Sequence, residues 1–173
     1  STPQETIVRI NSDGTRDTTF NIGTSFSPVR TAYDIDIQSD GKVIVGGNFN
    51  SYRGSSSPKI VRINTDGSYD STFAAGTGFN AEVTDLKILS DGSIIVIGNF
   101  TSYKGTPGIN RIAKLSSNGT IDLTFNTNIG TSFTTAPLVV KEVPGVGILI
   151  GGTFDSFNGS PAGSIICLNL DGT

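Results

Sequence analysis

The sequence contains no histidine, no tryptophan and no methionine, and it has one cysteine, Cys167. Without histidine, neither a Ser-His-Asp nor a Cys-His nucleophilic system can be assembled. A single cysteine cannot close a disulfide within the chain, so cysteine usage indicates neither an oxidising nor a reducing compartment. Because Cys167 stands in an expected strand and no histidine is present to activate it, we expect a buried or half-buried small side chain rather than a reactive thiol.

Charged residues are also scarce, at 16% of the chain, and the net charge is −3 with a pI near 4.8. Nucleic acids and anionic membranes require a basic patch, which this balance argues against. No apolar run approaches the roughly 18 residues of a membrane span, so we expect no membrane insertion. The sequence has no glycine-rich phosphate loop and no zinc ligand set, and we expect no cofactor.

One catalytic arrangement stays open. Glycosidases use a pair of carboxylates that can lie far apart in the chain. In this sequence, however, no pair of acids recurs outside turns and strands. We therefore expect a protein that is not an enzyme.

What the sequence does contain is a repeated motif. The stretch IVRINSDGTRDTTF begins at Ile7 and recurs from Ile60, Ile112 and Ile165, with spacings of 53, 52 and 53 residues. A constant period of this size is the mark of a repeat architecture. We divide this single repeat domain into copies at approximately 7–59, 60–111 and 112–164, followed by a partial fourth copy at 165–173.

Each copy contains four candidate β-strands. Glycine and threonine are abundant, alanine and leucine are sparse, and no long 3.6-residue apolar stripe is present, so helix is not favoured. A second motif, DIDIQSDGKVIVGGNF, supplies the last two strands of the first copy. The expected strands are Ile7 to Ile10, Arg16 to Phe20, Thr31 to Ile37 and Lys42 to Phe49, with a Gly/Ser/Phe loop at Asn21 to Pro28.

The turn chemistry predicts the register of these hairpins. Gly14 is the third residue of its loop, which suits a type I turn followed by a left-handed residue in a G1 bulge. That register pairs Ile10 with Arg16, whereas a two-residue Asp-Gly turn would shift it. The same loop type in the second motif places Ile37 opposite Val43, both apolar. A shift by one residue would break that agreement.

Four antiparallel strands in about 52 residues make one β-propeller blade. The runs at 43–45 and 94–97 are apolar on both faces, so sheets must pack against both sides of them. We predict an all-β, β-propeller-like array of about three four-stranded antiparallel blades that forms an incomplete ring. A stacked β-solenoid of four-stranded units is the alternative.

The units IVRINSDGTRDTTF and SDGKVIVGGNFNSYRG resemble the bacterial delta-60 repeat, a β-propeller-type repeat of uncharacterised function. The resemblance covers nearly the whole chain, although the third copy has Lys114 for arginine, Asn118 for aspartate and a Pro-Gly-Val-Gly loop. It implies an extracellular, cell-surface or virion-surface setting, as in adhesins and phage tail or fibre components. Because natural propellers have about four to eight blades, we expect either a portion of a longer repeat protein or a closed ring built with further copies.

The acids of the first motif are weak Ca²⁺ candidates, because hard cations bind several oxygens of one tight turn. The bidentate acid of a full calcium loop is absent, and Asp-Gly is also a common hairpin turn, so we expect no metal site. The same motif places an arginine opposite an aspartate, which suggests a register-fixing ion pair contributing a few tenths to about 1 kcal/mol. The Ca²⁺ candidates are Asp13, Asp17, Asp66 and Asp70, and the pairs are Arg9 with Asp17, Arg62 with Asp70, and Lys114 with Asp122.

Aromatic residues recur at fixed spacing. Those that end the first motif suit packing between blades, and those in short Ser-aromatic loops suit stacking on a sugar or docking on a protein. Gly14 and Gly67 are expected to be left-handed turn residues. The packing candidates are Phe20, Phe73 and Phe125, and the exposed binding candidates are Tyr52, Tyr103 and Phe157.

Two functions follow from this sequence. The first is a non-enzymatic surface binding or adhesion module that presents loops to a glycan or protein receptor. The second is a structural spacer or assembly component of a bacterial surface fibre or phage tail. In both, the partner is a receptor or further repeats of the same or a neighbouring chain, within a larger assembly.

Overall fold

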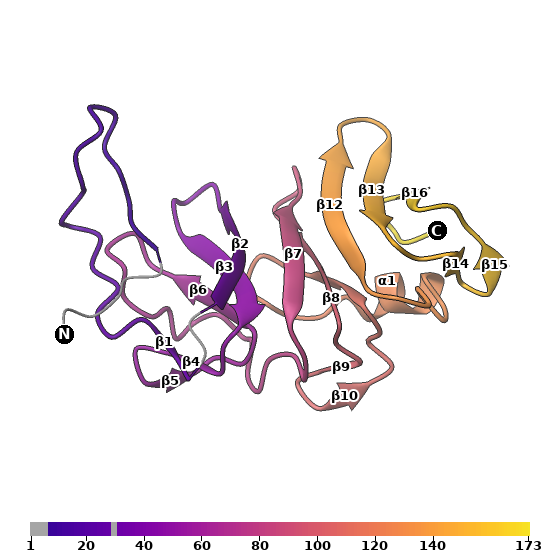
Figure 1. Cartoon of the computed structure of the whole chain (residues 1–173), viewed down its shortest axis with the longest axis horizontal. Helices are drawn as coiled ribbons and strands as arrows, with labels where there is room; N and C mark the ends of the chain where they lie inside the picture. The colour runs from indigo at the N-terminus through magenta and orange to yellow at the C-terminus, as the bar shows by residue number, and fades with distance from the viewer. Residues whose placement is uncertain (1–6, 29–30) are drawn as a thin grey trace.

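A computed structural model describes residues 7–28 and 31–173 as an all-β array of small antiparallel sheets with one short helix (Figure 1). In chain order the elements are β1 (Phe26–Ser27), β2 (Thr31–Ile37), β3 (Val43–Asn48), β4 (Ser51–Tyr52), β5 (Ser55–Ser56), β6 (Ile60–Ile63), β7 (Val83–Ile88), β8 (Ile94–Gly98), β9 (Ser102–Tyr103), β10 (Thr106–Pro107), β11 (Ile112–Leu115), α1 (Leu123–Asn128), β12 (Pro137–Val143), β13 (Gly147–Gly152), β14 (Ser156–Phe157), β15 (Ser160–Pro161) and β16 (Ile165–Leu168).

Three principal sheets form the array, with strand orders β2-β3-β6, β7-β8-β11 and β12-β13-β16. We call them the first, second and third blades. In each blade two inner strands come from one copy of the repeat, and the outer strand opens the next copy of the first motif. The blades stand side by side in an open arc, with the hairpin at 7–20 at one end and β16 at the other (Figure 1). The array is therefore propeller-like and does not close into a ring.

The predicted hairpin registers are confirmed. Ile10 bridges to Arg16, and Ile37 lies opposite Val43 in the β2–β3 pair. Gly14 has a φ of 85°, the left-handed conformation that a G1 bulge requires. Local turn chemistry and alternation were sufficient to place these pairs.

The strand expected after the Asx-Gly loop of the first motif is shorter than predicted in each of the first three copies. Instead of a strand from Arg16 to Phe20, the structure has a single bridge at Arg16, and the equivalent residues Tyr69 and Ile121 also form single bridges. The ladder ends because the next aspartate accepts hydrogen bonds from the chain ahead: Asp17 Oδ1 lies 2.8 Å from the Thr19 nitrogen. In the third copy Asp122 caps the short helix α1, which the composition did not predict.

The apolar core lies between the blades. One buried cluster joins Ile44 and Ile60 of the first blade to Val83 and Leu86 of the second. A second joins Ile95 and Ile97 of β8 to residues of the third blade. Both faces of β8 are buried, because β8 belongs to the central sheet of the array. The expectation that sheets pack on both sides of such strands is met there.

A cationic side chain links each outer hairpin to the following one. An amino or guanidinium group donates to a backbone carbonyl in the next Asx-Gly loop, over distances of 2.6, 2.7 and 2.8 Å. We call these the inter-blade cation contacts. They join Arg9 to Thr65, Arg62 to Ser117, and Lys114 to Leu170.

The outward face of the third blade is uncovered. Ile165 has 67% of its surface exposed, although the equivalent residues Ile60 and Ile112 have 0%. Cys167, on the same strand, is a free and exposed thiol. The expectation that Cys167 is buried or half-buried is therefore wrong, because within the described residues no sheet covers this face.

Candidate functional site: a polar cleft between the first two blades

The aromatic residues predicted to present a binding surface are not exposed in that way. Tyr52 and Tyr103 have 0% and 1% of their surface exposed, and Phe157 is half-buried. The hydroxyl of Tyr52 donates to the Gly67 carbonyl at 2.6 Å, and that of Tyr103 to Gly119 at 2.7 Å. The predicted exposure of these tyrosines is wrong, because their rings fill the space between the short strands and the outer hairpin.

Each of these aromatic residues belongs to a packed group of three rings. Ring centroids in the first group lie 4.5 and 5.1 Å apart, a separation typical of favourable aromatic contact. Such a group anchors the outer part of each blade, and it buries the rings of Tyr52 and Tyr103. The groups are Phe26, Phe49 and Tyr52, then Phe79, Phe100 and Tyr103, and finally Phe133, Phe154 and Phe157.

The weak Ca²⁺ candidates use their oxygens within their own hairpins. Asp13 accepts from the nitrogen and hydroxyl of Thr15, and Asp66 accepts from the Ser68 nitrogen. The hydrogen bonds from the Thr15 hydroxyl and nitrogen lower the pKa of Asp13, and those from the Ser68 hydroxyl and nitrogen lower the pKa of Asp66. Among residues 7–28 and 31–173, no group of three or more His, Cys, Asp or Glu side chains is arranged to hold a metal ion. The acids therefore stabilise turns in this structure.

Two of the three expected cross-hairpin ion pairs are formed. The Arg9 Nε atom lies 2.8 Å from Asp17 Oδ2, and Arg62 Nε lies 2.8 Å from Asp70 Oδ2. The first pair is partly exposed, whereas the second is buried, with 8% and 4% of the two side chains accessible. The same sequence pattern therefore gives one surface pair and one core pair.

The third expected pair, Lys114 with Asp122, is wrong. Lys114 Nζ instead donates to the Leu170 carbonyl at 2.8 Å and lies 3.7 Å from Asp91. Asp122 is the N-cap of α1 and accepts from the nitrogens of the first helical turn. The arginine at the equivalent position bonds its aspartate through Nε and the loop carbonyl through a terminal nitrogen, whereas the lysine has one terminal nitrogen, which lies at Leu170 and Asp91.

The recurrent phenylalanines are buried and lie at blade boundaries. Phe73 packs in the cluster shared by the first and second blades, and Phe125 in the cluster shared by the second and third. Phe20 packs against the opposite face of the first blade. The turn glycine Gly67 has a φ of 87°, as Gly14 has 85°.

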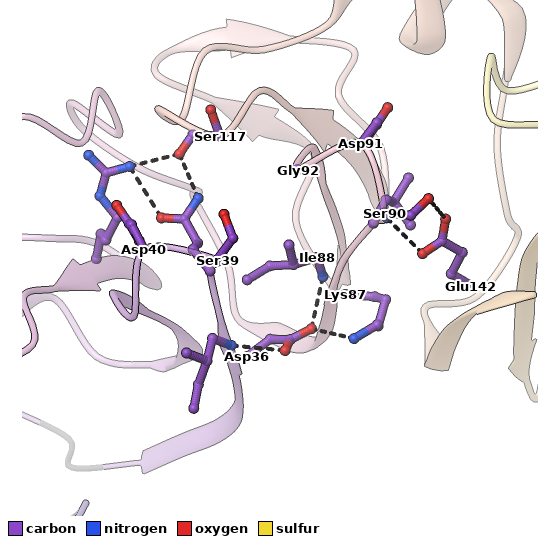
Figure 2. A pocket seen from close by; sticks show the side chains of 14 residues that line it. Asp36, Ser39, Asp40, Lys87, Ile88, Ser90, Asp91, Gly92, Ser117 and Glu142 are labelled. Atoms are coloured by element: carbon purple, nitrogen blue, oxygen red, sulfur yellow. Dashed lines mark hydrogen bonds and ion pairs between the residues drawn. The ribbon is translucent and has the colours of Figure 1, made fainter. Parts of the chain in front are cut away.

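A polar cleft opens where the inner hairpin loops of the first and second blades face each other (Figure 2). Its volume is about 640 Å³, within the range of small-ligand sites. The loop at 38–41 forms one wall and the loop at 90–92 the other. Exposed carboxylates at Asp40 and Asp91 and a hydroxyl at Ser39 line it.

An ion pair between the blades borders the cleft. Asp36 accepts from Lys87 Nζ at 2.7 Å and from the nitrogens of Ile88 and Ile37 at 2.9 Å each (Figure 2). Partial burial raises the pKa of Asp36, but the hydrogen bonds from Lys87 and the two nitrogens outweigh burial and hold the pKa below its usual value. Asp36 is therefore ionised at neutral pH, and it ties the two blades together.

The other borders of the cleft are equally fixed. Gln38 and Arg62 both donate to the Ser117 carbonyl, at 2.9 and 2.7 Å. On the second blade, the nitrogen and hydroxyl of Ser90 donate to Glu142 of the third blade at 2.8 and 2.6 Å (Figure 2). The cleft is thus a rigid polar surface, with its exposed acids and hydroxyls held on packed sheets.

A pair of carboxylates lies on the inner strands close by. Because β7 is an edge strand of its sheet, the Leu86 nitrogen can bond to side chains, and it is 3.0 Å from both Asp34 Oδ2 and Asp85 Oδ1. The other Asp85 oxygen accepts from the Val140 nitrogen at 2.7 Å. Burial, together with the hydrogen bond to Asp34 and its charge, raises the pKa of Asp85 to about 6. These contacts link the inner strands of all three blades.

Asp85 is expected to make the array more stable in mild acid. Its pKa is raised from 3.8 to about 6, so the folded state holds the extra proton and this stabilisation is lost as the pH rises through 6. Because Asp34 is only half-buried and water screens the pair, we expect about 1 to 2 kcal/mol. Asp85→Asn should therefore be more stable than the native chain at pH 7.5 by that amount, and nearly equal at pH 4. Urea unfolding at both pH values measures this.

The exposed Asp40→Asn variant, unfolded at the same two pH values, is the control for replacing a carboxylate with an amide elsewhere on the array. A difference between Asp85→Asn and the native chain that is the same at pH 4 and pH 7.5 would contradict the prediction.

The sequence did not predict the cleft. In the sequence, the Ser-Asp-Gly loops at 39–41 and 90–92 indicate only turns. Nothing in the sequence of one hairpin indicates which other loop that hairpin will face. The useful signal was the repetition itself: identical loops in adjacent blades of a propeller lie on the same side of the array.

The antiparallel sheets pack face to face around an arc. Each sheet begins with an inner hairpin, and the first strand of the next copy extends it. This arrangement defines a β-propeller repeat protein. The chain belongs to the family described as "Domain of unknown function (DUF5122) beta-propeller", whose sequence profile matches residues 3–20, 38–73, 89–125 and 148–173, more than half of the chain. No curated protein and no solved structure matches it significantly. In the described part of the chain, no helix has the length and apolarity needed to cross a membrane.

Proposed function

We propose that the chain is a non-enzymatic binding module of an extracellular, cell or virion surface, and that its repeats are of the bacterial delta-60 type. The delta-60 assignment is supported by the motif IVRINSDGTRDTTF and its copies, which fall within the matched segments. The polar cleft between the first two blades is the observation that carries the binding role.

The chemistry of the cleft favours a glycan. Exposed carboxylates and hydroxyls accept and donate hydrogen bonds to sugar hydroxyls, and Asp40 and Asp91 face the same space from two blades. The walls are held by inter-blade hydrogen bonds, so a ligand would not have to order the loops on binding. A loop of a protein receptor with exposed donors would meet the same groups.

A glycan array probed with the full chain tests this proposal. We expect binding to a defined set of glycans, weakened at least tenfold by Asp40→Ala or Asp91→Ala. Asp13→Ala is the matched control, because Asp13 is an exposed turn acid on the hairpin at 7–20 and does not line the cleft. The proposal would be contradicted by the absence of signal on both the array and a receptor pull-down. It would also be contradicted by binding that neither Asp40→Ala nor Asp91→Ala weakens.

A structural role in a surface fibre or phage tail is the second candidate. It is supported by apolar side chains exposed at both ends of the array, with Ile35 and Ile37 at one end and Leu149 and Ile165 at the other. This role predicts assemblies longer than one chain in light scattering and electron microscopy. It also predicts that the cleft variants assemble normally.

A further inference from the structure

The first blade exposes a position that the other two blades bury. Ile35 of β2 has 47% of its surface exposed, whereas Leu86 and Val140, which occupy the same position in β7 and β12, have 1% and 0%. The neighbour that covers Leu86 is the inner hairpin of the first blade, β2 with β3, whose Ile44 packs in the same cluster. No inner hairpin covers Ile35 within the described residues.

An outer hairpin nevertheless stands in front of the first blade. Residues 7–20 repeat the sequence of the hairpins at 60–73 and 112–125 and dock in the same way. Arg9 donates to the Thr65 carbonyl at 2.6 Å, as Arg62 does to Ser117 at 2.7 Å. The Asn21 nitrogen donates to Asp66, as Ala74 does to Asn118.

This hairpin lacks the strand that its copies pair with. Val61 of β6 lies opposite Val45 of β3, and Ala113 of β11 lies opposite Val96 of β8. For residues 7–10, the only pairing among the described residues 7–28 and 31–173 is the bridge within the hairpin, from Ile10 to Arg16. As far as residues 7–28 and 31–173 show, the hairpin is therefore the outer half of a blade, and no strand pairs with its inner edge.

A groove occupies the place of the inner half. It has a volume of about 370 Å³, and it lies between the hairpin at 7–20 and β2, which stand apart in Figure 1. Its lining is mainly apolar with one carboxylate, and consists of Ile7, Val8, Ala32, Tyr33, Asp34 and Ile35.

We propose that this groove binds an inner β-hairpin of the type that residues 31–48 form, supplied by another polypeptide segment. One strand of the incoming hairpin pairs with residues 7–10, as β3 pairs with β6. Its apolar side chains cover Ile35 and Ile37. Its aspartate, at the position of Asp34, accepts from the Ile35 nitrogen, as Asp34 accepts from Leu86 and Asp85 from Val140.

The opposite end of the array is not suited to fill the groove. In the third blade Val139 stands where Asp34 and Asp85 stand, immediately after the bulge. Cys167 stands where Arg62 and Lys114 make the inter-blade cation contacts. A second copy that presented its third blade would therefore supply neither polar contact. This inference does not depend on the polar cleft of the proposed function.

A fluorescein-labelled synthetic peptide with the sequence of residues 31–48 is the probe, added to the full chain and followed by anisotropy. We expect saturable binding and slower hydrogen exchange at the amides of residues 7–10. Ile35→Asp in the protein should weaken binding at least tenfold, and Asp34→Asn in the peptide should weaken it several-fold. Leu149→Asp is the matched control on the exposed face of the third blade and should leave binding unchanged.

A backbone-cyclised form of the peptide keeps the test decisive, because isolated hairpins are marginally stable. Failure of both linear and cyclised peptides to bind would overturn the proposal. So would binding that Leu149→Asp abolishes and Ile35→Asp does not. The chain could also self-associate through its own third blade. Self-association that either Ile35→Asp or Leu149→Asp abolishes would identify the third blade of a second copy as the occupant of the groove. That result would also overturn the proposal.

Discussion

Asp70→Ala is expected to lower the free energy of unfolding by about 3 to 5 kcal/mol, because it leaves a buried guanidinium without its counter-charge. Asp70 Oδ2 lies 2.8 Å from both Arg62 Nε and Lys42 Nζ, and its other oxygen accepts from Thr72. Burial raises the pKa of Asp70, but these donors outweigh burial and hold the pKa well below its usual range. Its contribution is therefore present at neutral pH and lost only in strong acid.

A double-mutant cycle measures the pairing. Arg62→Ala, Asp70→Ala and the double variant should show a coupling energy on the order of 2 kcal/mol in urea unfolding. The equivalent cycle at Arg9 and Asp17 is the matched control. There the arginine side chain is 40% exposed and water screens the pair, so the coupling should be clearly smaller than at Arg62 and Asp70. Equal coupling at the two sites would show that burial between blades does not strengthen the pair.

Gly67→Ala is expected to lower the free energy of unfolding by about 2 to 5 kcal/mol, for two reasons that add. Gly67 has a φ of 87°, a left-handed conformation that costs an alanine about 1 to 2 kcal/mol. A Cβ atom at Gly67 would also lie 2.5 Å from the Asn21 carbonyl oxygen, and relieving such a backbone overlap costs typically 1 to 3 kcal/mol. The hairpin at 7–20 would have to move away from the first blade.

Gly14→Ala separates the two reasons. Gly14 has nearly the same φ, 85°, but a Cβ atom there would meet nothing within 4 Å. We expect that variant to lose only the conformational contribution, about 1 to 2 kcal/mol. Thermal unfolding of both variants, with circular dichroism to confirm the fold, makes the comparison. Equal losses would mean that the contact with Asn21 relaxes without cost.

Much of the fold was predictable, because hairpins are local. Alternating side chains and the position of Gly14 in its loop predicted the register around Ile10 and Arg16, and the same reasoning placed Ile37 opposite Val43. The fixed spacing of the copies predicted that the sheets would repeat, and the apolar run at 94–97 predicted packing on both sides of β8. Each inference needed only neighbouring residues or the repeat itself.

Burial was predicted less well, because it depends on what stands in front of a residue. Tyr52 lies in a polar loop sequence, yet its ring is fully buried under the outer hairpin. Cys167 lies in an apolar strand, yet it is exposed on an uncovered face. The sequences around the two residues suggest the opposite of what is observed. Neither outcome is encoded within a single copy of the repeat.

The opening motif, IVRINSDGTRDTTF, illustrates which features nearby residues specify and which features depend on the packing of the blades. By itself the sequence determined its turn, its register and the arginine facing an aspartate, since these follow from residues fewer than ten positions apart. Only the tertiary structure decided that the exposed Arg9 pair and the buried Arg62 pair differ, that two Ser-Asp-Gly loops face each other across a cleft, and that a groove lies beside Ile35. The reason is physical: a hairpin specifies its own hydrogen bonds, whereas the packing of one blade against the next specifies which side chains water can reach.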